Sequence, residues 1–253
     1  MIPDFTVVVA VDFAHLEQLR VVLPTWRAYR PELFERLQSW LVICDDPTGR
    51  GEVAGTAHDI LSEHGARKLY FARWSWEPSL TQRERMLTAF VSCCHQVETP
   101  YWLKLDTDAF ATQPGPWIDE RWFDDSPAII ASPWGYTTPS HWPATLDAWG
   151  DTVPELAKYP PLNIPYDPAA RTVSHPRIAS WVMFGRTDFA HWCSSLVPEG
   201  ERLPVPSQDT MHWYLAQRTG ELIRPVKMKR FGWSNASKIK NLRQAVAGVM
   251  ANA

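Results

Sequence analysis

Asp106 and Asp108 stand one residue apart at the end of an apolar stretch, residues 101–111, with the sequence YWLKLDTDAFA. The stretch is typical of a buried strand, and Lys104 is its only other charged residue. Because side chains at positions i and i+2 of a strand project to the same side, both carboxylates can face one ligand. A divalent cation that prefers oxygen ligands, Mg²⁺ or Mn²⁺, would relieve their mutual repulsion. Such ions are usually completed by phosphates, which indicates a diphosphate-bearing substrate.

The same two aspartates also have a purely structural interpretation, in which Asp106 caps a turn and Asp108 opens a helix. Their context favours a ligand site, because the residues that precede them are apolar. In open α/β sheets, ligands bind beyond the carboxyl ends of the strands. The other segments of the chain therefore have to supply a sheet that places the pair at such an end.

Strand and helix patterns alternate through the first half of the chain. Apolar runs predict strands, and apolar residues at helical spacing predict a helix that Pro24 should kink or interrupt. A capping box of Thr81 and Glu84 opens a later helix. The alternation predicts an α/β fold with a mostly parallel, Rossmann-like central sheet and helices on both faces. The strands are expected at 5–11, 41–44, 70–72 and from 101, and the helices near 16–26 and 81–97.

The second half has a different composition. Short strands are expected at 128–131 and 180–184, and a helix capped by Ser207 at 208–217. Residues 133–176 hold nine prolines and little periodicity, and loops of this length are usually functional. The last segment, from Ile239 to Val249, is an amphipathic helix with a basic polar side. Packing against the domain is its expected role, with peripheral contact to anionic lipid as an alternative.

Bulk properties exclude several classes of protein. A chain of 253 residues fits one large α/β domain. A net charge of −3 argues against a nucleic-acid binder. There is no apolar run of the ~20 residues that span a bilayer, and the first residues lack the features of a secretory signal. The four cysteines have neither disulfide nor zinc spacing, so a cytoplasmic location is expected.

Three stretches besides the aspartate pair resemble the nucleotide-sugar-dependent glycosyltransferases of the GT-A fold, which carry a D-x-D motif. FTVVVAVDFAHLEQLRVVLPTW, residues 5–26, resembles their first strand and helix. LVICDDPTG, residues 41–49, is similar to the second strand and acidic turn of the family-2-like enzymes. TQRERMLTAF, residues 81–90, matches a helix that often carries basic residues near the nucleotide. The resemblance implies one GT-A-like domain over 1–253, with a nucleotide-binding half at 5–112 and an acceptor-binding half at 113–253.

The resemblance also implies roles for individual residues. The aspartate pair would hold the metal and the diphosphate, with Asp108 as the more direct ligand. UDP is the expected nucleotide on family grounds, and the acceptor would be a sugar, a glycan or a small molecule. Asp12 is equally compatible with an ordinary turn. The implied metal ligands are Asp106 and Asp108, and the implied nucleotide-binding residues are Val11, Asp12, Asp45, Asp46, Arg83, Arg85 and Asp106.

An inverting transfer needs a carboxylate that takes the proton from the attacking hydroxyl. In the family this base lies well after the metal motif, at the start of a helix, and Asp209 in SQD fits that place. The helix dipole would favour its ionised form, although first-turn aspartates are also common without catalytic function. Asp124 and Asp125 follow the metal strand too closely and are assigned to a loop. A retaining enzyme would lack the dedicated base.

The third metal ligand departs from the family pattern. Many relatives supply a late histidine, and here no histidine follows His212. His212, one turn beyond Asp209, and His175 are the candidates, although each is more often a surface or packed residue. The basic run Lys227, Lys229 and Arg230 could instead cover the diphosphate. Candidates for the acceptor side are Trp134, Trp142 and Trp181.

Other protein classes share parts of this pattern. A haloacid-dehalogenase-like phosphatase also uses D-x-D, usually early in the chain and followed by Thr or Val. A nucleotidyltransferase usually has a Gly-rich basic loop after its first strand, which residues 12–18 do not supply. A carbohydrate-binding protein could use the 14 tryptophans without a metal. The sequence favours a metal-dependent glycosyltransferase that uses a nucleoside diphosphate sugar. With Asp209 as its base, the enzyme is expected to be inverting.

Overall fold

The computed structural model describes residues 1–35, 38–46, 48–73, 81, 96–134, 137–139, 141–164, 172–174, 177–197, 202–205, 207–233 and 239–251. Arg83, Arg85 and His175, most of the helix expected at 81–97, and the side chain of Trp134 lie outside this description. The strands are β1 Phe5–Val11, β2 Ser39–Cys44, β3 Lys68–Arg73, β4 Tyr101–Leu105, β5 Ala109–Ala111, β6 Ile129–Trp134, β7 Thr137–Pro139, β8 Thr172–Ser174, β9 Arg177–Arg186, β10 Ile223–Pro225 and β11 Phe231–Trp233. The helices are α1 Phe13–Tyr29, α2 Glu52–Glu63, α4 Trp142–Thr152, α5 Thr187–Ser195, α6 Gln208–Thr219 and α7 Ile239–Met250, with 3-10 turns η1 Pro31–Phe34, η3 Glu120–Phe123 and η4 Pro154–Leu156.

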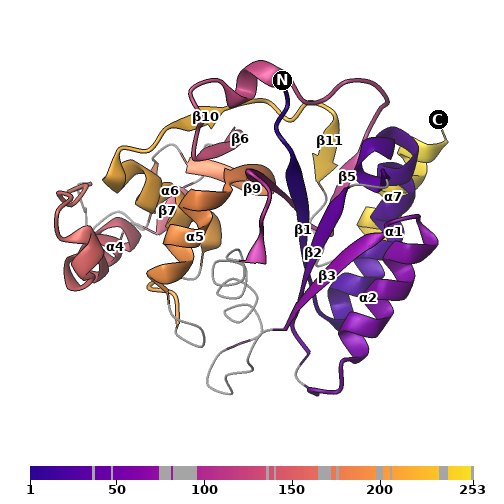
Figure 1. Ribbon diagram of the computed structural model, residues 1–253, viewed down its shortest axis with the longest axis horizontal. Helices are drawn as coiled ribbons and strands as arrows, with labels where there is room; N and C mark the ends of the chain where they lie inside the picture. The colour runs from indigo at the N-terminus through magenta and orange to yellow at the C-terminus, as the bar shows by residue number, and fades with distance from the viewer. Residues whose placement is uncertain are drawn as a thin grey trace.

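A seven-stranded sheet in the order β10-β6-β9-β4-β1-β2-β3 runs through the described part of the molecule (Figure 1). Neighbouring strands are parallel except at β9, which runs antiparallel to both β4 and β6. Helices α1, α2 and α7 cover one face, and α5 and α6 cover the other. The expected α/β class, with a mostly parallel sheet between helices, is confirmed.

The apolar runs form strands that are buried on both faces. Val7 and Val9 of β1 point into the core under α1, and Val8 points into the core under α6. Strand β4 alternates in the same way, with Leu103 on the α1 side and Trp102 on the α6 side. Continuous apolar sequence in these strands is therefore the consequence of two cores, one on each face of the sheet.

Helix α1 continues from Phe13 to Tyr29 through Pro24, so of the expected kink or interruption, the interruption is wrong. Two residues just after the proline tie the helix to β5. The indole of Trp26 donates to the carbonyl of Ala109 at 2.8 Å, and the hydroxyl of Thr25 accepts from the amide of Ala111 at 3.0 Å. These bonds hold the segment that follows Asp108 against the first helix.

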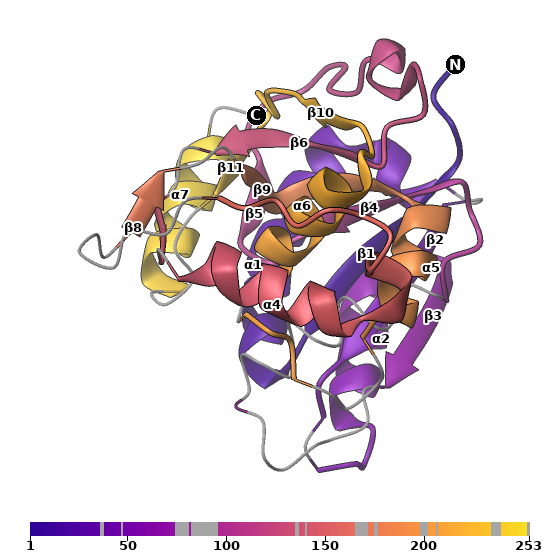
Figure 2. The ribbon, with the colours of Figure 1, turned by 90° about the vertical axis from the view of Figure 1, so that its left-hand side faces the viewer.

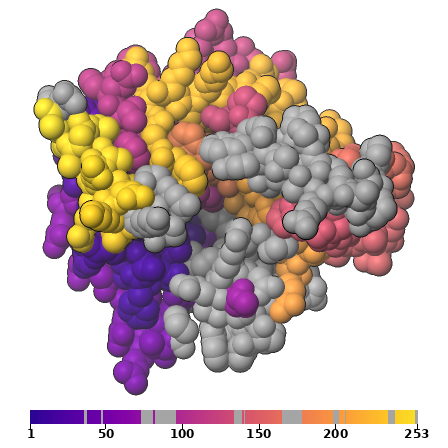
Figure 3. Space-filling view, turned by 180° about the vertical axis from the view of Figure 1, so that it is seen from behind, coloured from indigo at the N-terminus to yellow at the C-terminus, as the bar shows by residue number. Residues whose placement is uncertain are grey.

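The amphipathic C-terminal helix packs on the domain, as expected. Leu242 and Val246 of α7 are buried against the core under α1, and Arg243 pairs with Glu17 of that helix. Figure 3 shows the C-terminal segment in yellow lying against the indigo N-terminal segment. Among the described residues, no helix combines the length and the apolar character needed to cross a bilayer.

Gly185 in β9 lies under the indole of Trp102, and a methyl group there would overlap the ring. We expect Gly185→Ala to lower the free energy of unfolding by about 1–3 kcal/mol, because an aromatic ring in a packed core has no room to shift. Gly248 in α7 is the matched control, since a methyl group there meets no atom within 4 Å. Gly248→Ala should raise stability by about 0.5–1 kcal/mol. Urea denaturation of both variants measures this, and equal effects would contradict the packing argument.

Candidate active site

Four segments, the ends of β1, β2 and β4 and the start of α6, bring polar residues to one edge of the sheet. Strands β1, β2 and β4 are parallel, so their carboxyl ends meet at that edge. Strands β4 and β6 run in the same direction, because both are antiparallel to β9. Strand β10 is parallel to β6 and therefore runs in that direction too. Helix α6 directly precedes β10 in the chain. The end of α6 therefore lies where the strands begin, and its first turn lies at the carboxyl edge. This topology places Asp209 at the same edge as Asp106 and Asp108.

The positive charge of Lys104 stabilises the Asp106 carboxylate at the end of a buried strand. Its ammonium group forms an ion pair with the Asp106 carboxylate and donates to the carbonyl of Ser180 at 2.8 Å, although Lys104 is only 7% exposed. The backbone of Asp106 is fixed as well, since its amide donates to Trp181 and its carbonyl accepts from Ala109, each at 2.9 Å. The first carboxylate is thus held in place by an adjacent positive charge.

Asp108 is in a different environment. Burial, followed by the neighbouring charge of Asp106, raises the pKa of Asp108 from its ordinary value near 3.8 to about 7, while Lys104 and His15 act in the opposite direction. Because the ionised form of this carboxyl group is so unfavourable, a bound cation would stabilise it. The alternative in which Asp108 opens a helix is wrong, because the chain continues directly into strand β5.

His15 also belongs to this site, although it is not among the residues predicted from the sequence. Asp12 caps α1 by accepting from the amide of His15 at 2.8 Å, and the two side chains lie 2.7 Å apart. Burial opposes a charge on the ring, yet the bond to Asp12 and the charges of Asp12, Asp106 and Asp108 raise the pKa of His15. The signal was an Asp-x-x-His spacing at a helix start after the first strand.

The second strand brings two aspartates with unlike roles. The amide of Asp45 donates to the carbonyl of Val11 at 2.9 Å, and both residues are buried where β1 and β2 end. Asp46 accepts from the hydroxyl of Thr48 at 2.6 Å, from its amide at 3.1 Å and from the amide of Val53 at 3.4 Å. The Thr48 hydroxyl bond is the main reason that the pKa of Asp46 is lowered. Asp46 thus organises the turn into α2.

Asp209 lies in the first turn of α6, as expected. Ser207 caps the helix by accepting from the amide of Thr210 and contacts the Asp209 carboxylate through its hydroxyl. The Thr210 amide also donates to Asp209 at 3.1 Å. The side chain is half-buried. The helix start thus fixes this carboxylate at the edge that carries Asp106 and Asp108.

His212 is not brought together with the aspartate pair. The ring is 1% exposed, lies 6.0 Å from the indole of Trp102, and receives a 2.7 Å hydrogen bond at Nδ1 from Gln208. Burial lowers the pKa of His212 to about 4, so the ring is neutral. Within the described ranges, no group of three His, Cys, Asp or Glu side chains is arranged to hold a metal ion. The expectation that His212 joins Asp106 and Asp108 fails because α6 buries its ring against the sheet.

The basic run does not cover the aspartate pair either. Lys227, Lys229 and Arg230 line a cleft of about 1030 Å³ together with Ile2, which precedes β1. That cleft is at the edge where the parallel strands begin. Trp181, in contrast, is next to Asp106, whose amide it binds through its carbonyl. Trp142 opens α4.

Solved structures with a similar fold include a core-mannan synthase A from Aspergillus fumigatus in its Mn/GDP form, with TM-score 0.50 and 13% identity over 87% of this chain and 72% of that one. The mannosyltransferase Ktr4p from S. cerevisiae in complex with GDP has TM-score 0.56 and 9% identity, over 92% and 71%. The chain has the GT-A fold. A putative glucose-1-phosphate thymidylyltransferase from Bacillus anthracis is also similar, with TM-score 0.54 and 11% identity over 97% and 95%. No protein-family profile and no curated protein sequence matches the chain.

The raised pKa of Asp108 predicts a pH-dependent stability for the metal-free protein. Between about pH 4 and pH 7 the folded state keeps a proton on Asp108 that the unfolded chain releases. The free energy of unfolding should therefore fall as the pH rises through this window and level off above pH 7, by an amount on the order of a few kcal/mol. Asp108→Asn should remove this fall. Urea denaturation in EDTA at pH 5 and pH 8 measures it, and identical pH profiles for the two proteins would contradict the assignment.

Proposed function

We propose that the chain is a metal-dependent glycosyltransferase that moves a sugar from a nucleoside diphosphate donor to an acceptor. The observation that carries the proposal is the position of Asp106 and Asp108 at the carboxyl end of the central strand β4 in a GT-A fold. Ligands of open α/β sheets bind at this edge. Glycosyltransferases are among the solved structures with the same fold, which supports the assignment.

The residues at the edge fit a divalent cation and a diphosphate. The carboxylate oxygens of Asp108 and Asp106 would hold Mn²⁺ or Mg²⁺, which supplies positive charge to the diphosphate leaving group. Lys104 fixes Asp106 in one orientation, and the unfavourable ionisation of Asp108 without a cation favours a cation there. Asp12 and Val11, with Asp45, would border the nucleoside. Arg83 and Arg85 would contact the nucleotide and are proposed from the sequence alone.

Asp209 would take the proton from the attacking acceptor hydroxyl, which makes the transfer inverting. Its place in the first turn of α6 and its bonds to Ser207 and Thr210 support this role, because they hold the carboxylate at the edge where the donor binds. Trp181, whose backbone binds Asp106, would border the acceptor.

The nucleotide is proposed to be UDP, with GDP as the alternative. UDP rests on the resemblance of the sequence to family-2-like enzymes. Two structures of similar fold hold GDP, which supports testing both.

Nucleotidyl transfer is the second candidate, because a putative thymidylyltransferase has the same fold over nearly the whole of both chains. That reaction would transfer the nucleoside monophosphate group of a nucleoside triphosphate to a sugar phosphate, with pyrophosphate as the leaving group. Against it, β1 passes directly into α1 at Asp12, and no glycine-rich loop stands between them.

A donor panel separates the two reactions. The purified chain is incubated with UDP-sugars and GDP-sugars and Mn²⁺, and in parallel with nucleoside triphosphates and glucose 1-phosphate. We expect release of UDP or GDP from at least one sugar donor, because water replaces a missing acceptor slowly in such sites. Pyrophosphate release in the second set, without turnover of any sugar donor, would replace the proposal by nucleotidyl transfer.

A further inference from the structure

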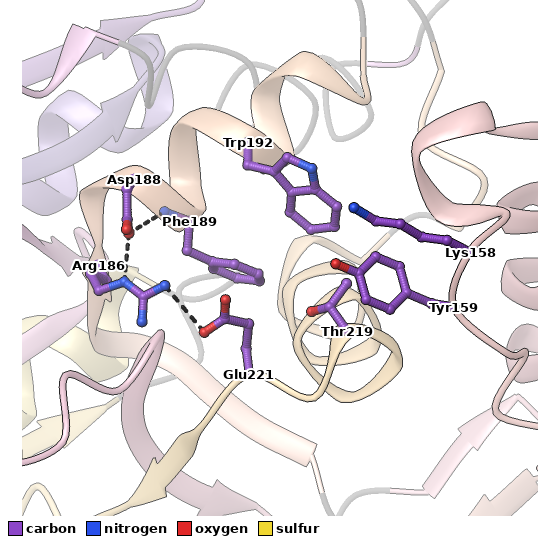
Figure 4. Close-up of a pocket in the computed structure, with 8 residues that line it drawn as sticks. All are labelled: Lys158, Tyr159, Arg186, Asp188, Phe189, Trp192, Thr219 and Glu221. Atoms are coloured by element: carbon purple, nitrogen blue, oxygen red, sulfur yellow. Dashed lines mark hydrogen bonds and ion pairs between the residues drawn. The ribbon is translucent and has the colours of Figure 1, made fainter.

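A cavity of about 320 Å³ lies at the edge of the sheet opposite the aspartate pair (Figure 4). It is bordered by the end of β9, by α5, by the end of α6 with the residues that follow it, and by the segment after η4. Arg186, the last residue of β9, pairs with Tyr101 at the start of β4, whereas Asp106 follows the other end of β4. The cavity is therefore roughly 17 Å along the sheet from Asp106 and is separate from the candidate active site.

One guanidinium group organises the polar wall of this cavity. Arg186 donates to Asp188 at 2.5 Å and to Glu221 at 3.1 Å, and it also binds the carbonyl of Ser126 at 2.6 Å. The bonds to the two carboxylates end on Oδ1 of Asp188 and Oε2 of Glu221, so their second oxygens are oriented without being used by Arg186. Carboxylates held in this way are ready acceptors for ligand hydroxyl groups.

Aromatic rings form the other walls. Trp192 extends from α5 and is backed by Phe189, with ring centroids 5.8 Å apart. Figure 4 shows Tyr159 approaching the same space from the segment after η4, with Thr219 and Glu221 between the two aromatic walls. The ammonium group of Lys158 lies 5.1 Å from the Tyr159 ring. Flat apolar surfaces beside fixed polar groups are the composition of a small-ligand site.

The Tyr159 wall is anchored to the core. Arg218 of α6 is 4% exposed and donates to the carbonyl of Tyr159 at 3.2 Å and to Asp151 at 2.8 Å. Asp147 of α4 accepts from Tyr214 at 2.8 Å, and Figure 2 shows α4 lying across α6. Because these part-buried bonds set the position of the segment, the cavity is formed before any ligand arrives.

The charges of the lining select a neutral ligand. Lys158 and Arg186 are balanced by Asp188 and Glu221, and Arg186 already serves both carboxylates. We propose that the cavity is a second saccharide-binding site, which takes a neutral pyranose unit. One C–H face of the ring would pack on Trp192 or Tyr159, and its hydroxyl groups would bond to Glu221, Asp188 and Lys158. Binding there requires neither metal nor nucleotide, so it is independent of the proposed transfer reaction.

Saturation-transfer NMR in EDTA, without nucleotide, tests the proposal with methyl α-D-mannopyranoside, methyl β-D-glucopyranoside and methyl β-D-galactopyranoside. At least one glycoside should receive saturation at its ring C–H protons. Of Trp192→Ala and Tyr159→Ala, on opposite walls, at least one should weaken this binding about tenfold or more, because it removes the surface on which the ring packs. Trp122→Ala is the matched control, since Trp122 is a half-buried tryptophan of a different cleft and should leave binding unchanged.

Three outcomes would overturn the proposal. The first is no saturation of any of the three glycosides by the wild-type chain. The second is saturation that both wall variants retain, or that UDP with Mn²⁺ displaces, since the sugar would then occupy the candidate active site. The third is competition by inorganic phosphate at equal concentration, which would make the cavity an anion site built on Lys158 and Arg186. The thermal midpoint of each variant shows whether weaker binding results from the missing aromatic ring or from unfolding of the chain.

Discussion

Asp108→Asn reduces turnover of the sugar donor by at least roughly a hundredfold, because a metal–carboxylate contact at a diphosphate contributes several kcal/mol to the transition state. The substitution keeps the size of the side chain and removes its charge. Asp106 alone would not replace both ligands, since one of its carboxylate oxygens is already paired with Lys104. The measurement is release of nucleoside diphosphate from the donor at saturating Mn²⁺, for the variant and the wild-type chain.

Asp59→Asn is the control for this experiment. Asp59 is an exposed aspartate of α2 that lies beside His58, and its neutralisation should leave turnover unchanged. Asp108→Asn should also leave the thermal midpoint of the metal-free protein unchanged or higher, because burial makes the ionised carboxylate unfavourable. A variant that folds normally and turns over donor at the wild-type rate would remove Asp108 from the metal site.

Asp209→Asn should lower kcat for transfer by about 10²–10⁴-fold, since the amide cannot accept the proton of the acceptor hydroxyl. Donor binding should be unchanged, because Asp209 approaches the edge from α6 and not from the strands that would hold the nucleotide. The rate should therefore fall in kcat with little change in the apparent affinity for the donor. The two parameters are measured by varying the donor at fixed acceptor.

Glu52→Gln is the matched control, because Glu52 is an exposed first-turn carboxylate of α2. It should behave as wild type. If Asp209→Asn retained full kcat while folding normally, Asp209 would be only a helix-start residue that its cap Ser207 holds in place. A changed affinity for the donor with unchanged kcat would instead assign Asp209 to donor binding.

Local sequence patterns were sufficient to predict much of the fold and the edge of the sheet that carries the candidate site. Apolar runs at β1 and β2 and the cap Ser207 of α6 are properties of short segments, and the structure has them where the sequence indicates. The parallel arrangement follows from the alternation of strands and helices. Placement of Asp106 and Asp108 at the carboxyl end of a strand follows from the same alternation.

The remaining features depend on contacts between distant segments. The sequence showed only that Lys104 is two residues from Asp106, not that the two form an ion pair. The ammonium group of Lys104 also binds the carbonyl of Ser180, which lies in the distant strand β9. His15 faces the aspartate pair because β1 and β4 are neighbours in the sheet. His212 was expected at the metal because it is one turn beyond Asp209. The face of α6 that carries it packs against Trp102 instead, and helical spacing alone does not show which face is buried.

Pro24 illustrates how tertiary contacts override a local rule. A proline inside a helix removes one backbone hydrogen bond and usually breaks or kinks the helix. Here Thr25 and Trp26, the two residues that follow the proline, bind the backbone of β5. These bonds hold the last turns of α1 against β5. The same bonds position the segment that follows Asp108, so the end of α1 is part of the support of the candidate site.

The most direct test of the central claim is calorimetric titration of UDP and of GDP into the purified chain, with Mn²⁺ and in EDTA. We expect one of the two nucleotides to bind with Mn²⁺, and we expect this binding to be lost in EDTA and in Asp108→Asn. Binding of GDP alone would keep the site and change the donor. If neither nucleotide binds with Mn²⁺ present, or if binding is the same in EDTA and in the variant, then Asp106 and Asp108 do not form a metal–diphosphate site.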